Sequence, residues 1–208
     1  MAQNDFEQRH LETLDRDLNR FSALEQATDY ASRPMMGLGV SLAFILVAGL
    51  VAFYLFGQTG NTLIVVIAAG FGAYMALNIG ANDVANNMGP AVGANALTMG
   101  GAIAIAAVFE SAGALLAGGD VVSTIAKGII APQSMQTASI FIWAMLAALL
   151  SAALWVNLAT WVGAPVSTTH SVVGGVMGAG IAAAGFAAVN WPTMYKIAAS
   201  WVISPVLG

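Results

Sequence analysis

Two short polar segments interrupt an otherwise strongly apolar chain, and the side chains in each could bind an ion. The first reads GANDVANNMGP over residues 80–90 and brings Asn82, Asp83 and Asn86 close together. Side chains four apart share a helix face, and carboxylate and carboxamide oxygens are the hard ligands that small cations such as Na⁺ prefer. The segment is therefore typical of a cation site, with a polar loop at the membrane surface as the alternative.

The second segment reads GAPVSTTHS over residues 163–171 and carries three consecutive hydroxyl side chains, Ser167, Thr168 and Thr169. Pro165 suits the first turn of a helix, and a helix N-terminus binds anions through its free N–H groups and its dipole. The pattern predicts a cradle for a tetrahedral oxyanion without a fixed positive charge. A Ser/Thr helix cap near the interface is the alternative.

Other ionisable side chains lie apart from these two segments. Glu110 stands among alanines inside an apolar run, where it is either a partnered or protonated buried carboxyl or a site for cation or proton coupling. His170 could donate to an anion or respond to pH, although a lone histidine is more often structural, which is the interpretation we favour. Asp120 and Lys127 are interpreted as loop charges.

The composition identifies the environment of these side chains. The 208 residues are 59% hydrophobic and 8% charged, whereas soluble domains contain about 25% charged residues. A bilayer core of about 30 Å needs roughly 20 apolar residues per helix, so residues 34–208 supply about five or six membrane segments. The absence of cysteine excludes disulfides and thiolate metal sites. We expect a membrane protein that is neither an enzyme nor a nucleic-acid binder.

The apolar runs predict an all-α, polytopic fold with broken or re-entrant helices. Apolar or small-residue runs cover Gly37–Phe56, Thr62–Ile79, Ala96–Ala117, Thr137–Val162, Pro165–Val189 and Tyr195–Gly208. Gly80 and the Gly89–Pro90 pair are expected to break the helix at the first polar segment. The residues from 137 to 189 form either a full span or a re-entrant hairpin with its tip near Pro165.

The predicted organisation has three parts: a polar arm over residues 1–33, an additional span within 34–61, and a region over 62–208 that carries both polar segments. Leucine spacing in the arm favours an amphipathic helix that lies on the membrane surface or pairs weakly with a partner. Four arginines in the arm place the N-terminus in the cytoplasm of a multi-pass protein of the cell membrane. Because the last run is too short to span, we expect the chain to continue.

The motifs together resemble the inorganic phosphate transporter (PiT) family over residues 62–208. The matching segments, in order, are GANDVANNMGP, FESAGALLAG with Glu110, VVSTIAKGII, PVSTTHSVVGGVMGAG and SWVISPVLG. The resemblance implies symport of inorganic phosphate with Na⁺ or H⁺ and no other cofactor. Family members resemble an inverted repeat with each motif in both halves. The single copies here imply an N-terminal half, completed by further chain or by a partner, in a homo-oligomer such as a dimer.

The resemblance also implies roles for particular side chains. The implied phosphate ligands are Asn82, Asp83, Ser167, Thr168 and Thr169. The implied cation-binding or coupling residues are Asp83, Asn86, Ser167 and Glu110, with Na⁺ at Asp83 and Asn86. The span Gly37–Phe56 precedes the motif helix, unlike the usual family arrangement, and this extra span agrees with a cytoplasmic N-terminus.

Three functions remain open at this level. The first is phosphate symport, and the second is symport of sulfate or a metal–phosphate complex by the same fold. Since the Asp83 carboxylate can accept a hydrogen bond from HPO₄²⁻, which sulfate lacks, phosphate is favoured. The third is a non-transporting membrane scaffold that packs against a partner.

Overall fold

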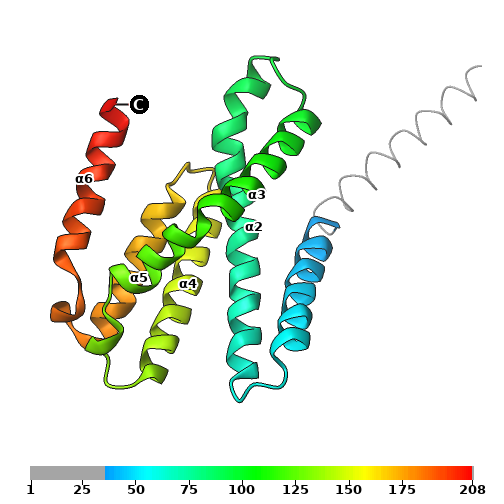
Figure 1. The fold of residues 1–208 in the computed structure, drawn as a ribbon. Coiled ribbons are helices and arrows are strands. Elements are labelled where there is room, and N and C mark those ends of the chain that lie inside the picture. Colours follow the sequence, from blue (N-terminus) through cyan, green and yellow to red (C-terminus); the bar gives the residue numbers. More distant parts are fainter. Residues whose placement is uncertain (1–35, 208) are drawn as a thin grey trace, which may run out of the picture. The chain divides into compact units, whose positions relative to one another are not determined.

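A computed structural model describes residues 36–207, and its regular elements are helices, which confirms the predicted all-α fold (Figure 1). The helix Met36–Phe56 comes first. It is followed by α2 (Thr62–Gly93), α3 (Met99–Ser123), a π-helical turn (Thr124–Gly128), a 3₁₀ turn (Pro132–Ser134), α4 (Ala138–Trp161), α5 (Thr168–Ala184), a 3₁₀ turn (Phe186–Ala188) and α6 (Trp191–Leu207). Residues 48–207 belong to one compact unit, which contains every site described below.

Within residues 36–207, four helices are long and apolar enough to cross a membrane: Met36–Phe56, α2, α3 and α4. They correspond to the first four apolar runs of the sequence. The helices α5 and α6 have 17 residues each, fewer than the roughly 20 that a bilayer core requires. The predicted amphipathic arm, residues 1–33, lies outside the part of the chain that the structure describes.

Helix α2 contradicts the expected break at the first polar segment. It continues for 32 residues, through Gly80 and Pro90, to Gly93. A glycine in a helix interior costs only about 1 kcal/mol of helix stability. Pro90 lies in the last turn of α2, so only three helical residues follow it. The polar side chains of the segment are therefore presented on a continuous helix surface rather than on a loop.

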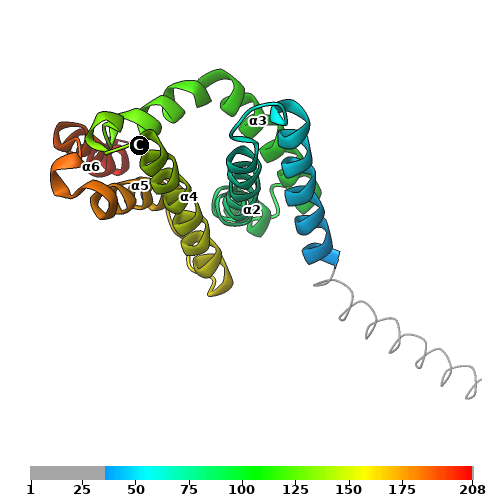
Figure 2. The same cartoon turned by 90° about the horizontal axis from the view of Figure 1, so that it is seen from below.

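Helices α4 and α5 form an antiparallel pair whose connection contains the second polar segment. Figures 1 and 2 show α4 between α5 and α2. Gly175 lies so close to α4 that an added Cβ would be 2.7 Å from the Ala148 carbonyl oxygen. The sequence predicted Pro165 in the first turn of a helix. This prediction is wrong, because α5 begins at Thr168 with Ser167 as its N-cap. The pair therefore ends in a tip, residues 162–167, that faces α2 through the contacts described below.

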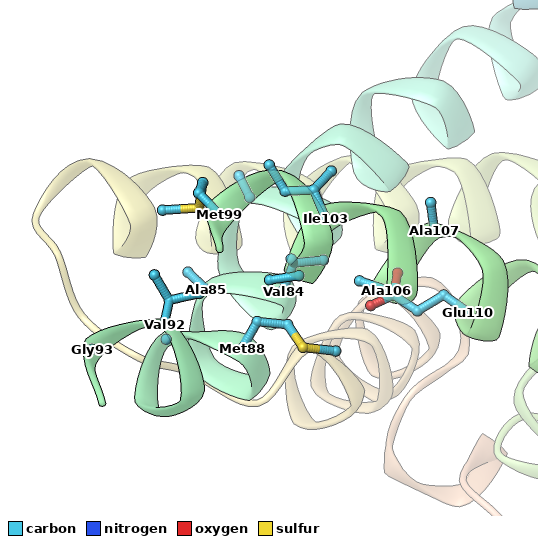
Figure 3. A pocket seen from close by; sticks show the side chains of 14 residues that line it. Val84, Ala85, Met88, Val92, Gly93, Met99, Ile103, Ala106, Ala107 and Glu110 are labelled. Carbon is cyan, nitrogen blue, oxygen red and sulfur yellow. The ribbon is translucent and has the colours of Figure 1, made fainter. Parts of the chain in front are cut away.

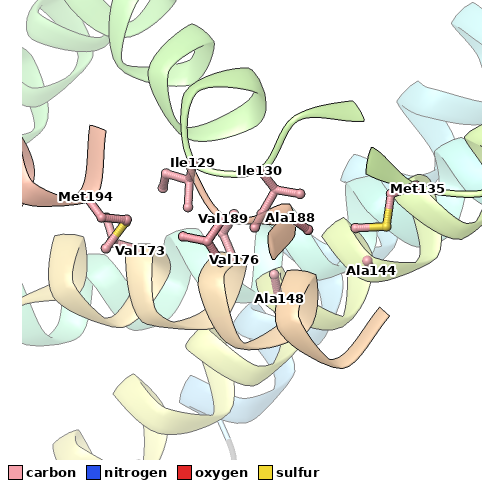
Figure 4. Packing of buried hydrophobic residues seen from close by; sticks show 10 residues of the cluster. All are labelled: Ile129, Ile130, Met135, Ala144, Ala148, Val173, Val176, Ala188, Val189 and Met194. Carbon is pink, nitrogen blue, oxygen red and sulfur yellow. The ribbon is translucent and has the colours of Figure 1, made fainter. Parts of the chain in front are cut away.

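A buried apolar cluster fixes the chain that leads from α3 to α4 (Figure 4). Ile129 and Ile130 are almost completely buried, and an added Cβ at Gly180 would be 2.3 Å from the Ile130 Cδ1. The Asn190 N–H donates to the Ile129 carbonyl at 2.8 Å. Asp120 lies within α3 rather than in the predicted loop, because the helix extends to Ser123. The cluster holds the far end of α3 against α5.

Candidate functional site

The two polar segments meet directly, although they are far apart in the sequence. The Thr168 Oγ1 donates a hydrogen bond to the Asp83 Oδ2 at 2.8 Å, across 85 residues of chain. Both side chains are half-buried. A hydroxyl donor on a carboxylate forms a strong, charge-assisted hydrogen bond. The carboxylate of the first segment is thus attached to the first turn of α5.

Asn82 forms the second connection and uses all of its hydrogen-bonding capacity. Its Nδ2 donates to the Thr160 Oγ1 at 3.1 Å and to the Ala164 carbonyl at 3.3 Å. Its Oδ1 accepts from the Val166 N–H at 3.4 Å and from the Asn86 Nδ2 at 3.0 Å. Only 5% of the Asn82 surface is exposed. The residue therefore joins α2 to the end of α4 and to the tip.

The backbone partners determine which way the amide groups point. A backbone N–H can only donate and a carbonyl can only accept, so Val166 and Ala164 fix the Oδ1 and Nδ2 of Asn82. Because Asn86 must then donate its Nδ2 to Asn82, its Oδ1 is left available as an acceptor. Asn86, Asn82 and the tip line a cavity of about 350 Å³.

Three polar side chains that the sequence analysis did not select extend this network. On α4, Asn157 donates its Nδ2 to the Asn78 Oδ1 at 2.8 Å. Asn78 is 5% exposed and donates to the Tyr74 carbonyl at 2.8 Å. Thr160 donates to the Val156 carbonyl at 2.8 Å. The available signal was spacing, since Asn78 and Asn82 lie four apart on α2 and Asn157 and Thr160 lie three apart on α4.

The N-terminus of α5 has the features of an anion site. Ser167 accepts at its Oγ from the His170 N–H at 3.3 Å, and its hydroxyl proton is not needed for that bond. The N–H groups of Thr168 and Thr169 belong to the first turn, where no intrahelical acceptor exists. Ser167 and Thr169 are both exposed. Donors and the positive end of the helix dipole therefore gather beside Asp83.

Two of the selected residues lie away from the Asp83–Thr168 contact. Thr169 lines a different cavity of about 310 Å³, together with Asp120, Thr124 and Ser200. Glu110 is exposed and lines an apolar cavity of about 790 Å³ between α2 and α3, at the opposite end from Met99 (Figure 3). The structure therefore brings together Asn82, Asp83, Asn86 and Thr168, whereas Ser167 lines a cavity with Trp155 and His170, and Thr169 and Glu110 lie apart.

His170 packs against an aromatic ring of α6. Its ring centroid lies 3.8 Å from that of Trp201, with an interplanar angle of 32°. The side chain is exposed and lines a cavity with Trp155 and Ser171. The stacking on Trp201 is consistent with the structural role favoured from the sequence.

Comparisons with known proteins give a matching family model and named relatives. A model described as "Phosphate transporter family" matches residues 79–208. The chain is 52% identical over 193 residues to a Helicobacter pylori protein named "Putative phosphate permease". The aligned region covers 92% of this chain and 36% of that protein. It is 41% identical to "Inorganic phosphate transporter 2-1, chloroplastic" of Arabidopsis thaliana over 90% of this chain and 33% of that protein.

A solved structure shares the fold as well as the sequence. The chain titled "The sodium-dependent phosphate transporter" is 48% identical and has a TM-score of 0.66, over 70% of this chain and 36% of that one. This chain thus spans about a third of the length of the relatives it matches. Its four apolar helices make it a membrane protein. With the family match covering both polar segments and most of the described helices, the chain belongs to the phosphate transporter family.

Proposed function

We propose that this chain supplies part of the substrate and ion site of a transporter that moves inorganic phosphate across a membrane together with a cation. The observation that carries the proposal is the hydrogen bond from Thr168 to Asp83. It places an anionic carboxylate beside a helix N-terminus that favours anions. The helix N-terminus already faces the Asp83 carboxylate, so a second anion there requires a bound cation to offset the added negative charge, and coupled transport provides that cation.

The cation is assigned to the Asp83 side. Asp83 keeps one carboxylate oxygen unoccupied by Thr168, and Thr168 keeps oxygen lone pairs because it acts as a donor. The Asn86 Oδ1 is left free by the orientation of Asn82. These groups offer oxygen acceptors and one negative charge, which suits a small hard cation and not an anion.

Phosphate is assigned to the α5 side. The first-turn N–H groups and the Ser167 hydroxyl supply hydrogen-bond donors. A lysine or arginine is not needed there, since the bound cation compensates the phosphate charge. The position of Asp83 also favours an anion that carries a proton, because HPO₄²⁻ can donate to a carboxylate.

The relatives support a choice of coupling ion and a source for the remaining ligands. The similar structure is titled a sodium-dependent transporter, which supports Na⁺ over H⁺. The chain holds one copy of each polar motif and spans about a third of its relatives' length. We therefore propose that further chain or a partner subunit supplies the remaining ligands, and that Glu110 acts in coupling from its separate cavity.

Radiolabelled phosphate uptake tests the proposal in proteoliposomes that contain the complete gene product. Na⁺ and pH are varied independently, and unlabelled sulfate is added as a competitor. We expect uptake that requires an inward Na⁺ gradient and resists excess sulfate. Uptake driven equally well by a proton gradient alone would reassign the cation. Competition by sulfate at the phosphate half-saturation concentration would reassign the substrate, and the absence of any uptake would reject transport.

A further inference from the structure

We infer that Asn82 is a positioning residue rather than a ligand, and that Thr160 and Asn157 of α4 support it. In this arrangement Asn82 holds the tip, residues 162–167, in the position along α2 at which the Thr168 hydroxyl can contact the Asp83 carboxylate. The inference rests on the proposed function, because it assigns how one part of that site is built. It changes the role that the family resemblance implies for Asn82.

The hydrogen bonds of Asn82 carry the inference. A carboxamide has two N–H donors and two acceptor lone pairs. Both donors and both lone pairs of Asn82 have partners: Thr160, Ala164, Val166 and Asn86. A phosphate or a cation at Asn82 would have to displace one of them in a side chain that is 5% exposed. The neighbouring Asp83 has Thr168 as its one side-chain partner among residues 36–207.

The same contacts explain what Asn82 positions. It binds the carbonyl of Ala164 and the N–H of Val166, and Val166 comes two residues before Thr168. Asn82 also directly precedes Asp83 in α2. One buried side chain thus fixes both the donor and the acceptor of the Thr168–Asp83 bond.

Helix α4 provides the support from the other side. The Thr160 hydroxyl is held in one orientation because it donates to the Val156 carbonyl and accepts from Asn82. One turn earlier, Asn157 donates to the buried Asn78 of α2. These two contacts fix the register of α4 against α2, since a shift along either helix would break both.

The test compares three substitutions in the complete gene product: Asn82→Leu, Thr160→Val and Thr160→Ser. Asn82→Leu and Thr160→Val are expected to raise the half-saturation concentration for phosphate by about threefold to tenfold, the usual effect of one lost hydrogen bond. The double variant should be no worse than the poorer single variant, since both changes remove the same connection. Thr160→Ser keeps the hydroxyl and should retain the wild-type half-saturation concentration.

Hydrogen exchange of the peptide over residues 162–168 gives a readout that does not depend on transport. We expect faster exchange in Asn82→Leu and Thr160→Val, because the Val166 N–H loses its acceptor or its support, and wild-type exchange in Thr160→Ser. If the double variant raises the half-saturation concentration by the product of the two single effects, Asn82 acts independently of Thr160 as a ligand. That result would overturn the inference. Unchanged exchange would also overturn it, as would variants with less folded protein but wild-type half-saturation. If the wild type takes up no phosphate, the proposed function fails while the exchange measurement still decides the role of Asn82.

Discussion

A hydroxyl group that donates to a carboxylate changes what both groups can offer to a third. Thr168 donates its single hydroxyl proton to Asp83. The pair therefore presents oxygen lone pairs and a negative charge toward any further ligand. Its neighbour Ser167 keeps a proton to donate, because its oxygen accepts from the His170 N–H. Two adjacent hydroxyls of one motif therefore suit opposite partners: Thr168 offers an acceptor to a cation, and Ser167 offers a donor to an anion.

Replacement of Asp83 by asparagine tests the cation side of this division. Asp83→Asn keeps the side-chain shape but removes the charge, and we expect cation-dependent phosphate uptake to fall by at least about tenfold, as for the loss of a charged hydrogen-bonding group. Membrane insertion and the amount of folded protein should be unchanged.

The matched control is Asp120→Asn, an exposed carboxylate outside the Asp83–Thr168 contact. It should leave the cation dependence of uptake close to wild type. Wild-type uptake by Asp83→Asn would remove Asp83 from the ion site.

Replacement of Thr168 by valine tests the hydroxyl. Thr168→Val is nearly isosteric and leaves the Asp83 Oδ2 without its 2.8 Å donor, so we expect the half-saturation concentration for phosphate to rise by roughly tenfold. Thr168→Ser should recover most of the affinity because it retains the donor. Both values come from initial rates of uptake at sub-saturating Na⁺, because a weaker cation site lowers the phosphate affinity through the coupling between the two ions. An unchanged half-saturation concentration in Thr168→Val would exclude the hydroxyl from the site.

Sequence reasoning found the residues of the Asp83–Thr168 contact because their types are unusual in apolar surroundings. It did not find Asn157 or Thr160, whose partners on α2 are 79 and 78 residues away, respectively. Nothing in the local pattern of α4 indicates which helix it faces. The role of such side chains depends on a helix pairing that only the folded chain reveals.

At the scale of elements, the positions of the helices followed from hydrophobic runs, whereas their ends did not. Gly80 and Pro90 were expected to end α2, yet α2 continues to Gly93. Local propensities are about 1 kcal/mol for a glycine, and contacts such as those of Asn78 and Asn82 with α4 outweigh them. The break near Pro165 is real, but Ser167 caps α5 two residues later than Pro165 suggested.

Close packing of α4 against α5 leads to a prediction about stability. Gly175→Ala places a Cβ 2.7 Å from the Ala148 carbonyl oxygen and 3.2 Å from the Ser151 Oγ. Because a backbone oxygen in the facing helix cannot rotate away, we expect a loss of about 1–3 kcal/mol in the free energy of unfolding. The thermal midpoint of purified protein in detergent measures the effect.

The adjacent glycine is the control for this substitution. A Cβ at Gly174 has no heavy atom within 4 Å, and alanine is the better helix former by up to about 1 kcal/mol. Gly174→Ala should therefore leave the midpoint unchanged or raise it slightly. Equal destabilisation by both substitutions would show that the close approach of α5 to α4 is not what Gly175 provides.

At the scale of the whole molecule, the orientation in the membrane can be tested directly because the chain contains no cysteine. The predicted cytoplasmic N-terminus and the helix Met36–Phe56 place the following turn on the outer side. A cysteine at the exposed Gln58 should therefore react with an impermeant maleimide in intact cells. A cysteine introduced at Ser32 should react only after the cells are permeabilised, and the reverse pattern would place the N-terminus outside.

The long separation of Asp83 and Thr168 also has a consequence for biosynthesis. At about 5–20 residues per second, the ribosome needs about 4 to 17 s to add the 85 residues between them. During that interval α2 has already emerged with its carboxylate, while the helix that carries the matching hydroxyl has not been made. The nascent protein must therefore pass through a stage in which an acidic, amide-rich helix lacks the partner that its carboxylate contacts in the folded chain.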